Sequence, residues 1–578
     1  MTEYQAPTDA VLDALDAVGL SALLEIDAFA HVDRATVATL VEEFGRFVDE
    51  VIVPTDAIGD RVGSTYDPAT SEVTTPEGFA KAYRRYVESG WGALAFPQEH
   101  GGGGLPRVVG LALQEMMTSA NMALSLNPVL TQSVIEGLTR LGTPDQQQRF
   151  VPHLLTGEWN GTMLLTEPDA GSDVGAVRTR AEQDEDGTWR ITGTKLFITW
   201  GEHDLTDNIV HLVLARTPGA PAGTKGLSLF LVPKRAVDAD GRLGGRNAVR
   251  CVSVEHKVGI HASPTCVLDF ERAEAELVGE VGDGMRMMFV VMNSARLSIG
   301  LQGLAVAEIT TQQATAYAHE RRQGRTSTTP PGESALIDEH PDVRRMLRTM
   351  QSTTEAVRLV LYTTGAQADL AAHHPDEAVR QAARERADLL TPIAKAWSTD
   401  EGVAVSSLAV QVHGGVGYVE ETGVARHWRD ARIAPIYEGT NGIQAIDLVM
   451  RKLRMRDGAV VDELLRELEA LDAPLAAAGD DLATVRSTLA DALVAARTAT
   501  SWLIERASAA PDDALAGATV YLDLLGSTLG GALLARSALR LRTPRAIGLA
   551  TFYATERLAR VPGLLGPVTA GAARLADF

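Results

Sequence analysis

A single carboxylate, Glu438, stands in a setting that could make it a general base. It lies in Ile-Tyr-Glu-Gly-Thr, between a bulky aromatic residue and a glycine, which is typical of a tight turn. A carboxylate on such a turn can project into an apolar cavity, where the loss of water raises its pKa and strengthens it as a base. A lone Glu-Gly-Thr is also common in ordinary surface turns. The hypothesis therefore depends on a second signal.

That signal lies far upstream, in LLTEPDAGSDVG at 164–175 and KLFIT at 195–199. Alone, the first segment is a turn-rich loop whose Ser172 and Asp173 could simply satisfy their own backbone. Both segments precede RDARIAPIYEGTNGIQ, which begins at residue 429. This order of motifs resembles the acyl-CoA dehydrogenases, and the resemblance covers about residues 30–455.

The ends of the chain resemble one subgroup of that family. The features are YQAP at 4–7, YAHERRQGR at 317–325 and a long C-terminal extension. The subgroup holds large bacterial members with a C-terminal helical extension, among them broad-range acyl-CoA dehydrogenases and enzymes acting on 3-methylmercaptopropionyl-CoA.

The resemblance implies FAD as cofactor, because removing hydrogens from Cα and Cβ of a thioester requires a hydride acceptor that no side chain provides. Phe197 matches an aromatic against the isoalloxazine ring, although a strand aromatic in the core is the plainer interpretation. Ser172 matches a serine near the pyrophosphate or pantetheine. The remaining positions that match flavin contacts in this region are Met163, Leu165, Thr166 and Thr199.

Further cofactor contacts are implied in the second half of the chain. Gln411, Gly414 and Gly415 match a turn whose backbone amides approach the diphosphate, and within it His413 is expected only to hydrogen-bond locally. Arg321 and Gln323 match a pair that reaches the FAD of a neighbouring subunit. Small family members carry a phenylalanine between that glutamine and the following glycine, and this chain has none.

Two further matches follow the base, and one of them departs from the family. Thr440 and Asn441 match the positions that touch the flavin. Many members have serine and glutamine where this chain has Asn441 and Gly442, so the second contact is open.

Arg296 and Arg451 match cations that meet the phosphates of CoA, with a helix-surface ion pair as the plainer alternative. Some members place their base immediately before the first arginine, where this chain has Ala295. The acid–base work then falls to Glu438. It would take the α-proton while the β-hydrogen leaves as hydride to flavin N5, giving a trans-2-enoyl-CoA. The electrons would pass to an electron-transfer flavoprotein.

Elements that position these residues can be read from periodicity. We expect an α+β multidomain fold with a helical N-terminal domain at 1–160 and a central β-barrel or sandwich at 161–275. A helical bundle at 280–455 and a helical extension at 456–578 follow. The sequence predicts one helix starting at Thr75-Pro76 and one continuous helix over 107–131. No apolar run approaches the length of a membrane span.

Composition limits the partners. The net charge of −22 argues against a nucleic-acid partner. The N-terminus lacks the basic and apolar pattern of a secretory signal, and Cys251 and Cys266 form no disulfide framework or metal pattern, so we expect a cytoplasmic protein with two reduced core cysteines. The resemblance implies a homodimer.

Three rivals remain. A DNA-associated flavoprotein of this fold would have a strongly basic C-terminal domain, whereas residues 456–578 hold 12 basic and 15 acidic residues. An acyl-CoA oxidase differs only in oxygen access to the flavin and would release peroxide. A non-catalytic helical scaffold would purify colourless.

Overall fold

The chain forms two compact units in the computed structural model, which describes residues 4–576 except for the side chains of residues 290, 291, 293 and 294. One unit comprises Phe47–Leu105 and Asn121–Ala295, and the other Met1–Arg46, Pro106–Ala120 and Arg296–Phe578. Contacts therefore divide the expected helical domain of residues 1–160 between the two units.

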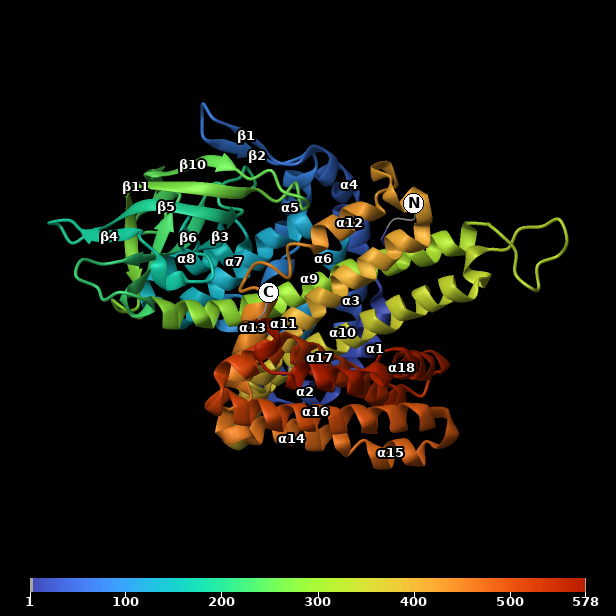
Figure 1. Ribbon diagram of the computed structural model, residues 1–578. Coiled ribbons are helices and arrows are strands. Elements are labelled where there is room, and N and C mark those ends of the chain that lie inside the picture. Colours follow the sequence, from blue (N-terminus) through green and yellow to red (C-terminus); the bar gives the residue numbers. More distant parts are fainter. Residues whose placement is uncertain (1–3, 577–578) are drawn as a thin grey trace. The chain divides into compact units, whose positions relative to one another are not determined.

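The strands of the first unit gather in one region, with helices beside them (Figure 1). Strands β11, β5, β4, β6 and β7 pair in that order, and β7 also pairs with β11, so the path closes as in a barrel. Strands β10 and β3 flank this ring. The strands are β3 (Asn160–Leu164), β4 (Arg180–Gln183), β5 (Trp189–Thr199), β6 (Ile209–Arg216), β7 (Leu227–Pro233), β10 (Val249–Val254) and β11 (Thr265–Val278). Two small hairpins add β1 (Thr65–Asp67) with β2 (Glu72–Thr74), and β8 (Arg235–Val237) with β9 (Leu243–Arg246).

Alternating apolar residues of these strands fill the interior, as the period of two predicts. Phe230, Ile191 and Phe270 are fully buried there, together with Cys251 and Cys266. Both cysteines are free, as expected. The helices of this unit are α4 (Val53–Val62), α5 (Phe79–Glu88), α7 (Met122–Leu141) and α8 (Pro144–Thr156).

Two predicted helices differ in detail. The helix expected from Thr75 begins at Phe79, because Thr75 bonds Asp204 through its amide and hydroxyl, at 3.1 and 2.7 Å, and does not cap a helix. The helix expected over 107–131 breaks at Asn121, whose extended backbone and side-chain bond to the Leu124 amide, at 2.9 Å, start a new helix.

Long helices make up the second unit, as predicted. They are α9 (Gly284–Glu320), which begins in the first unit, α10 (Pro341–His373) and α11 (Glu377–His413). Pro341 occupies the first turn of α10, where its missing N–H costs nothing. The connection between α9 and α10 projects from the helices (Figure 1). Four further helices join them: α1 (Thr8–Ala17), α2 (Leu20–Leu24), α3 (Arg34–Phe47) and α6 (Arg107–Ala120).

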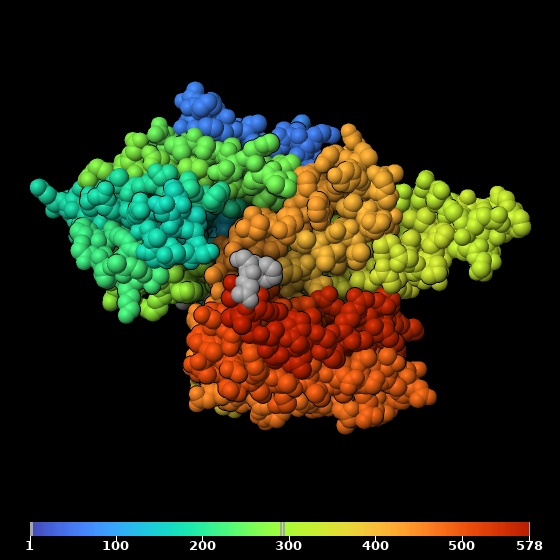
Figure 2. Space-filling model, viewed as in Figure 1, coloured from blue at the N-terminus to red at the C-terminus, as the bar shows by residue number. Residues whose placement is uncertain are grey.

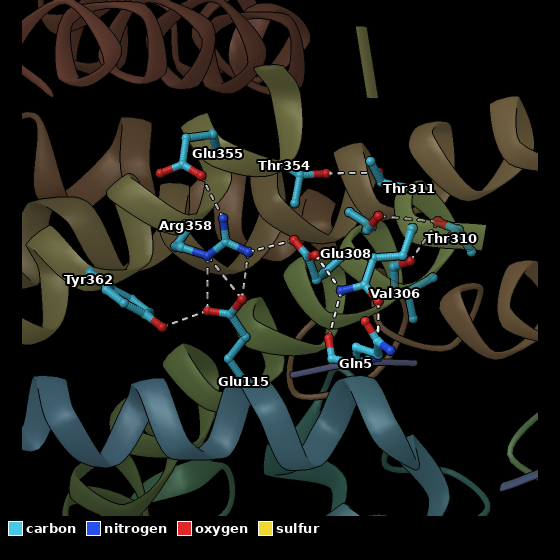
Figure 3. A network of polar contacts seen from close by, with 12 residues as sticks. Gln5, Glu115, Val306, Glu308, Thr310, Thr311, Thr354, Glu355, Arg358 and Tyr362 are labelled. Carbon is cyan, nitrogen blue, oxygen red and sulfur yellow. Dashed lines mark hydrogen bonds and ion pairs between the residues drawn. The ribbon is translucent and has the colours of Figure 1, made fainter. Parts of the chain in front are cut away.

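A buried charge network links three of these helices (Figure 3). Arg358 on α10 donates to Glu115 on α6 at 2.7 Å, to Glu308 on α9 at 2.6 Å and to Glu355 at 2.6 Å. Tyr362 donates to Glu115 at 2.6 Å. One buried guanidinium thus joins α6 to α9 and α10. Removing it would be costly, because the carboxylates would stay buried without their cation.

The C-terminal extension packs as a continuous block of helices within this unit (Figure 2). Helix α17 crosses Trp397 of α11 at Gly526 and Gly530, where a Cβ would lie 2.5 and 2.9 Å from the indole. The remaining helices are α12 (Val424–Ala431), α13 (Asn441–Asp447), α14 (Ala459–Glu469), α15 (Asp472–Ala477), α16 (Ala483–Ala509), α17 (Pro511–Leu541), α18 (Pro544–Glu556) and α19 (Leu565–Thr569).

In the part of the chain that the structure describes, one helix, α17, is long and apolar enough to cross a membrane by length and composition, contrary to the expectation that no stretch approaches that length. Its most apolar window is 83% buried within the protein. A helix that packs on its neighbours in this way is typical of the centre of a bundle.

Candidate active site

Glu438 lies on a strained turn between α12 and α13. Its φ is +54°, and that of Gly439 is +77°, so two successive residues adopt the left-handed conformation. Thr440 follows, and its hydroxyl caps α13 by accepting from the Ile443 amide at 3.2 Å. A non-glycine residue in this conformation persists only where its surroundings fix it, and such residues concentrate at functional sites.

Three helices hold the turn in this conformation. The Tyr437 hydroxyl donates to Gln302 on α9. From α13, Gln444 donates to the carbonyls of Glu438 and Gly439, at 3.4 Å each. From α11, Lys395 donates to the Gly439 carbonyl at 3.0 Å. Sequence reasoning misses all three side chains: Gln302 and Lys395 lie far from the turn in the chain, and the motif that contains Gln444 does not show where its side chain points.

The electrostatic setting suits a base. Burial raises the pKa of Glu438, and the positive charges of Arg296 and Lys395 oppose that rise. Arg296 reaches this region from α9, and its predecessor Ala295 is an apolar, buried residue. Glu438 is thus a partly desolvated carboxylate beside two cations, which can accept a proton from a substrate carbon.

The side chain of Asn441, a residue matched to a flavin contact, is bonded within the chain. Its side chain is buried and donates to the Ala396 carbonyl at 3.1 Å and to Asp400 at 2.8 Å, while its oxygen accepts from Lys395 at 2.8 Å. These bonds occupy the amide within the chain. Its side chain therefore fixes the turn to α11, and any flavin contact here would have to come from its backbone or from Thr440.

The two arginines matched to CoA phosphates share one carboxylate. Arg296 is buried and lies 3.7 Å from Asp447, while the exposed Arg451 lies 3.2 Å from the same residue. Burial lowers the pKa of Arg296, and Asp447 and Glu438 oppose that effect. Arg296 thus contributes its charge to the base turn. A contact of either arginine with CoA stays a prediction.

In the first unit, Phe197 stands out on β5. Its side chain is 58% exposed and its φ is +57°. The register of β5 against β11 shifts between Lys195 and Ile198, so a β-bulge turns the ring outward. Bulges next to active sites serve to re-aim one side chain in this way. The core interpretation of Phe197 is therefore wrong, and an exposed flat ring on a rigid strand fits a planar cofactor.

A buried ion pair anchors the neighbouring loop. Lys195 donates to Glu167 at 2.8 Å and to the Leu165 carbonyl at 3.0 Å. Glu167 also accepts from the amides of Arg178 and Thr179, at 2.6 and 3.0 Å. Burial lowers the pKa of Lys195 to about 8. The TEP and KLFIT segments are thus joined in the fold, because Glu167 of the first binds Lys195 of the second.

The other flavin-matched residues of this unit lie around that pair. Met163 is buried on β3, and Leu165 and Thr166 are half-buried just beyond its end. Thr199 ends β5 half-buried, and its carbonyl accepts from the Thr162 hydroxyl at 2.8 Å. Ser172 lies exposed in the following loop.

The glycine turn at the end of α11 leaves its backbone open. Gln411, Gly414 and Gly415 are exposed, and Gly414 has a φ of +62°. Among the described residues, no atom lies within 4 Å of a Cβ built at either glycine. Such a turn fits an approaching phosphate group. His413 is buried, stacks on Tyr317 and bonds the Ala409 carbonyl at 2.7 Å, so its role is local.

Arg321 and Gln323 lie exposed where α9 gives way to the projecting connection. They contact each other weakly, at 3.5 Å. A contact with a second subunit stays a prediction.

Comparisons with known proteins cover most of the chain. Residues 36–158, 162–273 and 282–453 match the N-terminal, middle and C-terminal domains of acyl-CoA dehydrogenases. Residues 464–578 match a model described as acetyl-CoA dehydrogenase C-terminal like.

Two curated relatives span nearly the whole chain. The 3-methylmercaptopropionyl-CoA dehydrogenase of Ruegeria pomeroyi is 44% identical over 93% of this chain and 91% of its own length. The broad-specificity linear acyl-CoA dehydrogenase FadE5 of Mycobacterium tuberculosis is 35% identical over 93% of this chain and 90% of its own.

Among solved structures, ACDH-11 of Caenorhabditis elegans in complex with C11-CoA superposes with a TM-score of 0.80 at 20% identity, over 97% of this chain and 93% of that one. This likeness confirms the predicted fold class. Given the domain matches and the two relatives, the chain belongs to the acyl-CoA dehydrogenase family of oxidoreductases.

Proposed function

We propose that this chain is an FAD-dependent acyl-CoA dehydrogenase in which Glu438 removes the α-proton of an acyl-CoA thioester, giving a trans-2-enoyl-CoA. One observation carries the proposal: Glu438 is a partly desolvated carboxylate on a left-handed turn, next to two cations, in a chain with alanine at the alternative position 295.

The chain's own residues would perform three tasks. The Glu438 carboxylate accepts the α-proton, and its basicity comes from burial. The backbone N–H of Glu438 donates to the thioester carbonyl and stabilises the charge that develops there. Arg296 and Lys395 favour the ionised form of the carboxylate and oppose the effect of burial.

FAD fits the residues present. Phe197 offers a flat exposed ring, and Gly414 and Gly415 offer an open backbone. The residues that would hold the cofactor are Met163, Leu165, Thr166, Ser172, Phe197, Thr199, Gln411, Gly414, Gly415 and Thr440, with Arg321 and Gln323 from a second subunit. When bound, FAD supplies the acceptor for the β-hydride.

The assembly and the electron acceptor are part of the proposal. We take the enzyme as a homodimer, which the exposure of Arg321 and Gln323 supports. An electron-transfer flavoprotein would reoxidise it. Peroxide release at the rate of aerobic turnover would instead identify an oxidase.

The first experiment is anaerobic bleaching of the yellow protein by acyl-CoA. Wild-type protein should bleach, and Glu438→Gln should bind FAD without bleaching. Glu421→Gln is a matched control, because Glu421 is an exposed carboxylate in the same stretch. Bleaching of Glu438→Gln at the wild-type rate would refute the assignment of the base.

The acyl chain is tested in the same assay. The relative at 44% identity is named for 3-methylmercaptopropionyl-CoA and the one at 35% for linear acyl-CoA. Pentanoyl-CoA has the chain length of the sulfur compound with a methylene in place of sulfur, so the ratio of the two bleaching rates measures the effect of the sulfur atom.

A further inference from the structure

Lys395 lies on α11 directly against the turn that carries Glu438. Its side chain is fully buried, and its Nζ donates to the Gly439 carbonyl at 3.0 Å and to the Asn441 side-chain oxygen at 2.8 Å. Gly439 follows the base in sequence. The ammonium group thus binds the turn on the C-terminal side of Glu438 through two of its three N–H donors.

Further residues on the same face of α11 also bind the turn. The side-chain nitrogen of Asn441 donates to the Ala396 carbonyl at 3.1 Å and to Asp400 at 2.8 Å, and it lies 3.0 Å from the Thr399 hydroxyl. Lys395 and Thr399 are four residues apart, and so are Ala396 and Asp400, so all four lie along the same side of the helix. This face holds the turn as a unit.

The location of Lys395 is unusual for a lysine. Among the described residues, no carboxylate lies within 4 Å of its Nζ, and the oxygens of Gly439 and Asn441 that it binds are both neutral. Burying a charged lysine here costs more free energy than burying a neutral side chain of the same length. Glutamine or methionine would fill the space, so a requirement for the charge itself explains the lysine better than packing does.

The charged groups around Lys395 are Glu438 and Asp400, which favour its protonated form, and Arg296, which disfavours it. Burial outweighs them and lowers the pKa of Lys395 to about 7. In the other direction, Lys395 and Arg296 lower the pKa of Glu438 against the effect of burial. Lysine and base are therefore coupled electrostatically as well as through the Gly439 carbonyl.

We propose that Lys395 is a positioning residue of the reaction: its ammonium group fixes the left-handed turn at Glu438, and its positive charge favours the carboxylate form of that residue. This inference rests on the proposed role of Glu438 as the base. It adds a residue on α11 to the residues on which proton removal depends.

The test compares three substitutions in the FAD-loaded enzyme. Lys395→Met removes both the donors and the charge, Lys395→Gln keeps a donor without the charge, and Lys395→Arg keeps the charge. The measurement is the rate of flavin reduction in anaerobic single turnover as a function of pH. Lys452→Met is the control, because this lysine lies outside α11 and pairs with Asp388 of α11 at 3.6 Å. Its known partner is therefore not part of the turn.

Loss of the charge should raise the pKa of Glu438, because a neighbouring cation favours the carboxylate. The acidic limb of the pH profile should therefore move to higher pH by about one unit in Lys395→Met and Lys395→Gln. The rate at neutral pH should fall about tenfold or more. Lys395→Arg should keep the limb near its wild-type position, and Lys452→Met should change neither quantity.

Two results would overturn the proposal. One is a wild-type rate and limb in Lys395→Met or Lys395→Gln. The other is a lower rate with an unmoved limb, which a purely structural role produces. If Lys395→Met does not fold, Lys395→Gln decides. If the Lys395 variants give one of these results while Glu438→Gln is inactive, only the role of Lys395 is refuted. If Glu438→Gln is active, the assignment of Glu438 as the base is refuted.

Discussion

Replacing Lys195 with methionine should lower the free energy of unfolding of the first unit, which carries Phe197. The contacts of Lys195 indicate by how much. The ammonium group lies 2.8 Å from Glu167 and 3.0 Å from the Leu165 carbonyl, and both side chains are buried. Methionine fills the space of the lysine stem but leaves Glu167 ionised with two amide donors only. Removing one partner of a buried pair costs about 3–5 kcal/mol.

The double variant Lys195→Met/Glu167→Gln separates charge from packing. Glutamine can still accept from a backbone amide, so the double variant should lose only about 1–2 kcal/mol. Glu167→Gln alone completes the cycle, and because it also costs stability the coupling between the two sites is at least about 2–3 kcal/mol. Lys225→Met, at an exposed position, should change stability by less than about 0.5 kcal/mol.

The assay is urea unfolding of the FAD-free protein, followed by circular dichroism. FAD retention on gel filtration is measured in parallel, because Leu165 loses a bond next to the expected flavin strand. A loss below about 1 kcal/mol for Lys195→Met, or two additive single substitutions, would refute the reasoning.

The remaining predictions concern the cofactor, pH and packing. Phe197→Ala should weaken FAD binding by roughly tenfold without unfolding the protein, since the ring is exposed; equilibrium dialysis measures this. Burial raises the pKa of Asp369 to about 7, so its contribution to stability is present below its ordinary value of 3.8 and lost as pH rises through about 7. Asp369→Asn should flatten that part of the curve of unfolding free energy against pH. Gly526→Ala should cost about 1–3 kcal/mol because its Cβ would meet Trp397, whereas Gly548→Ala, with open space around it, should cost nothing in thermal unfolding.

Much of the architecture could be predicted from local pattern. Pro341 marks the start of α10, and alternating residues with Asp186-Gly187 turns mark the β-region. The predicted helix boundaries were wrong where a contact with a distant residue overrides the local sequence signal. Thr75 and Pro76 have the composition of a helix start, yet the Thr75 hydroxyl bonds Asp204, 129 positions away. Asn121 divides a stretch whose apolar pattern is continuous.

The site shows the same division. The turn at Glu438 could be predicted because its own neighbours make it. The Lys195–Glu167 pair and the contact of Lys395 with Gly439 join residues 28 and 44 positions apart, so no local spacing predicts them. Asn441 shows a further limit of sequence reasoning, because a match in position does not show that its side chain bonds Lys395 and Asp400 on α11. Its expected contact with the flavin stays a prediction.

Proton removal by Glu438 is tested most directly by exchange of the substrate's α-hydrogens with deuterated water. FAD-loaded enzyme and saturating acyl-CoA are incubated without oxygen, and the recovered thioester is analysed by mass spectrometry. We predict deuterium at the α-carbon with the wild-type enzyme and with Glu421→Gln, and none with Glu438→Gln, although that variant still binds FAD and acyl-CoA. Exchange at the wild-type rate in Glu438→Gln would contradict the account.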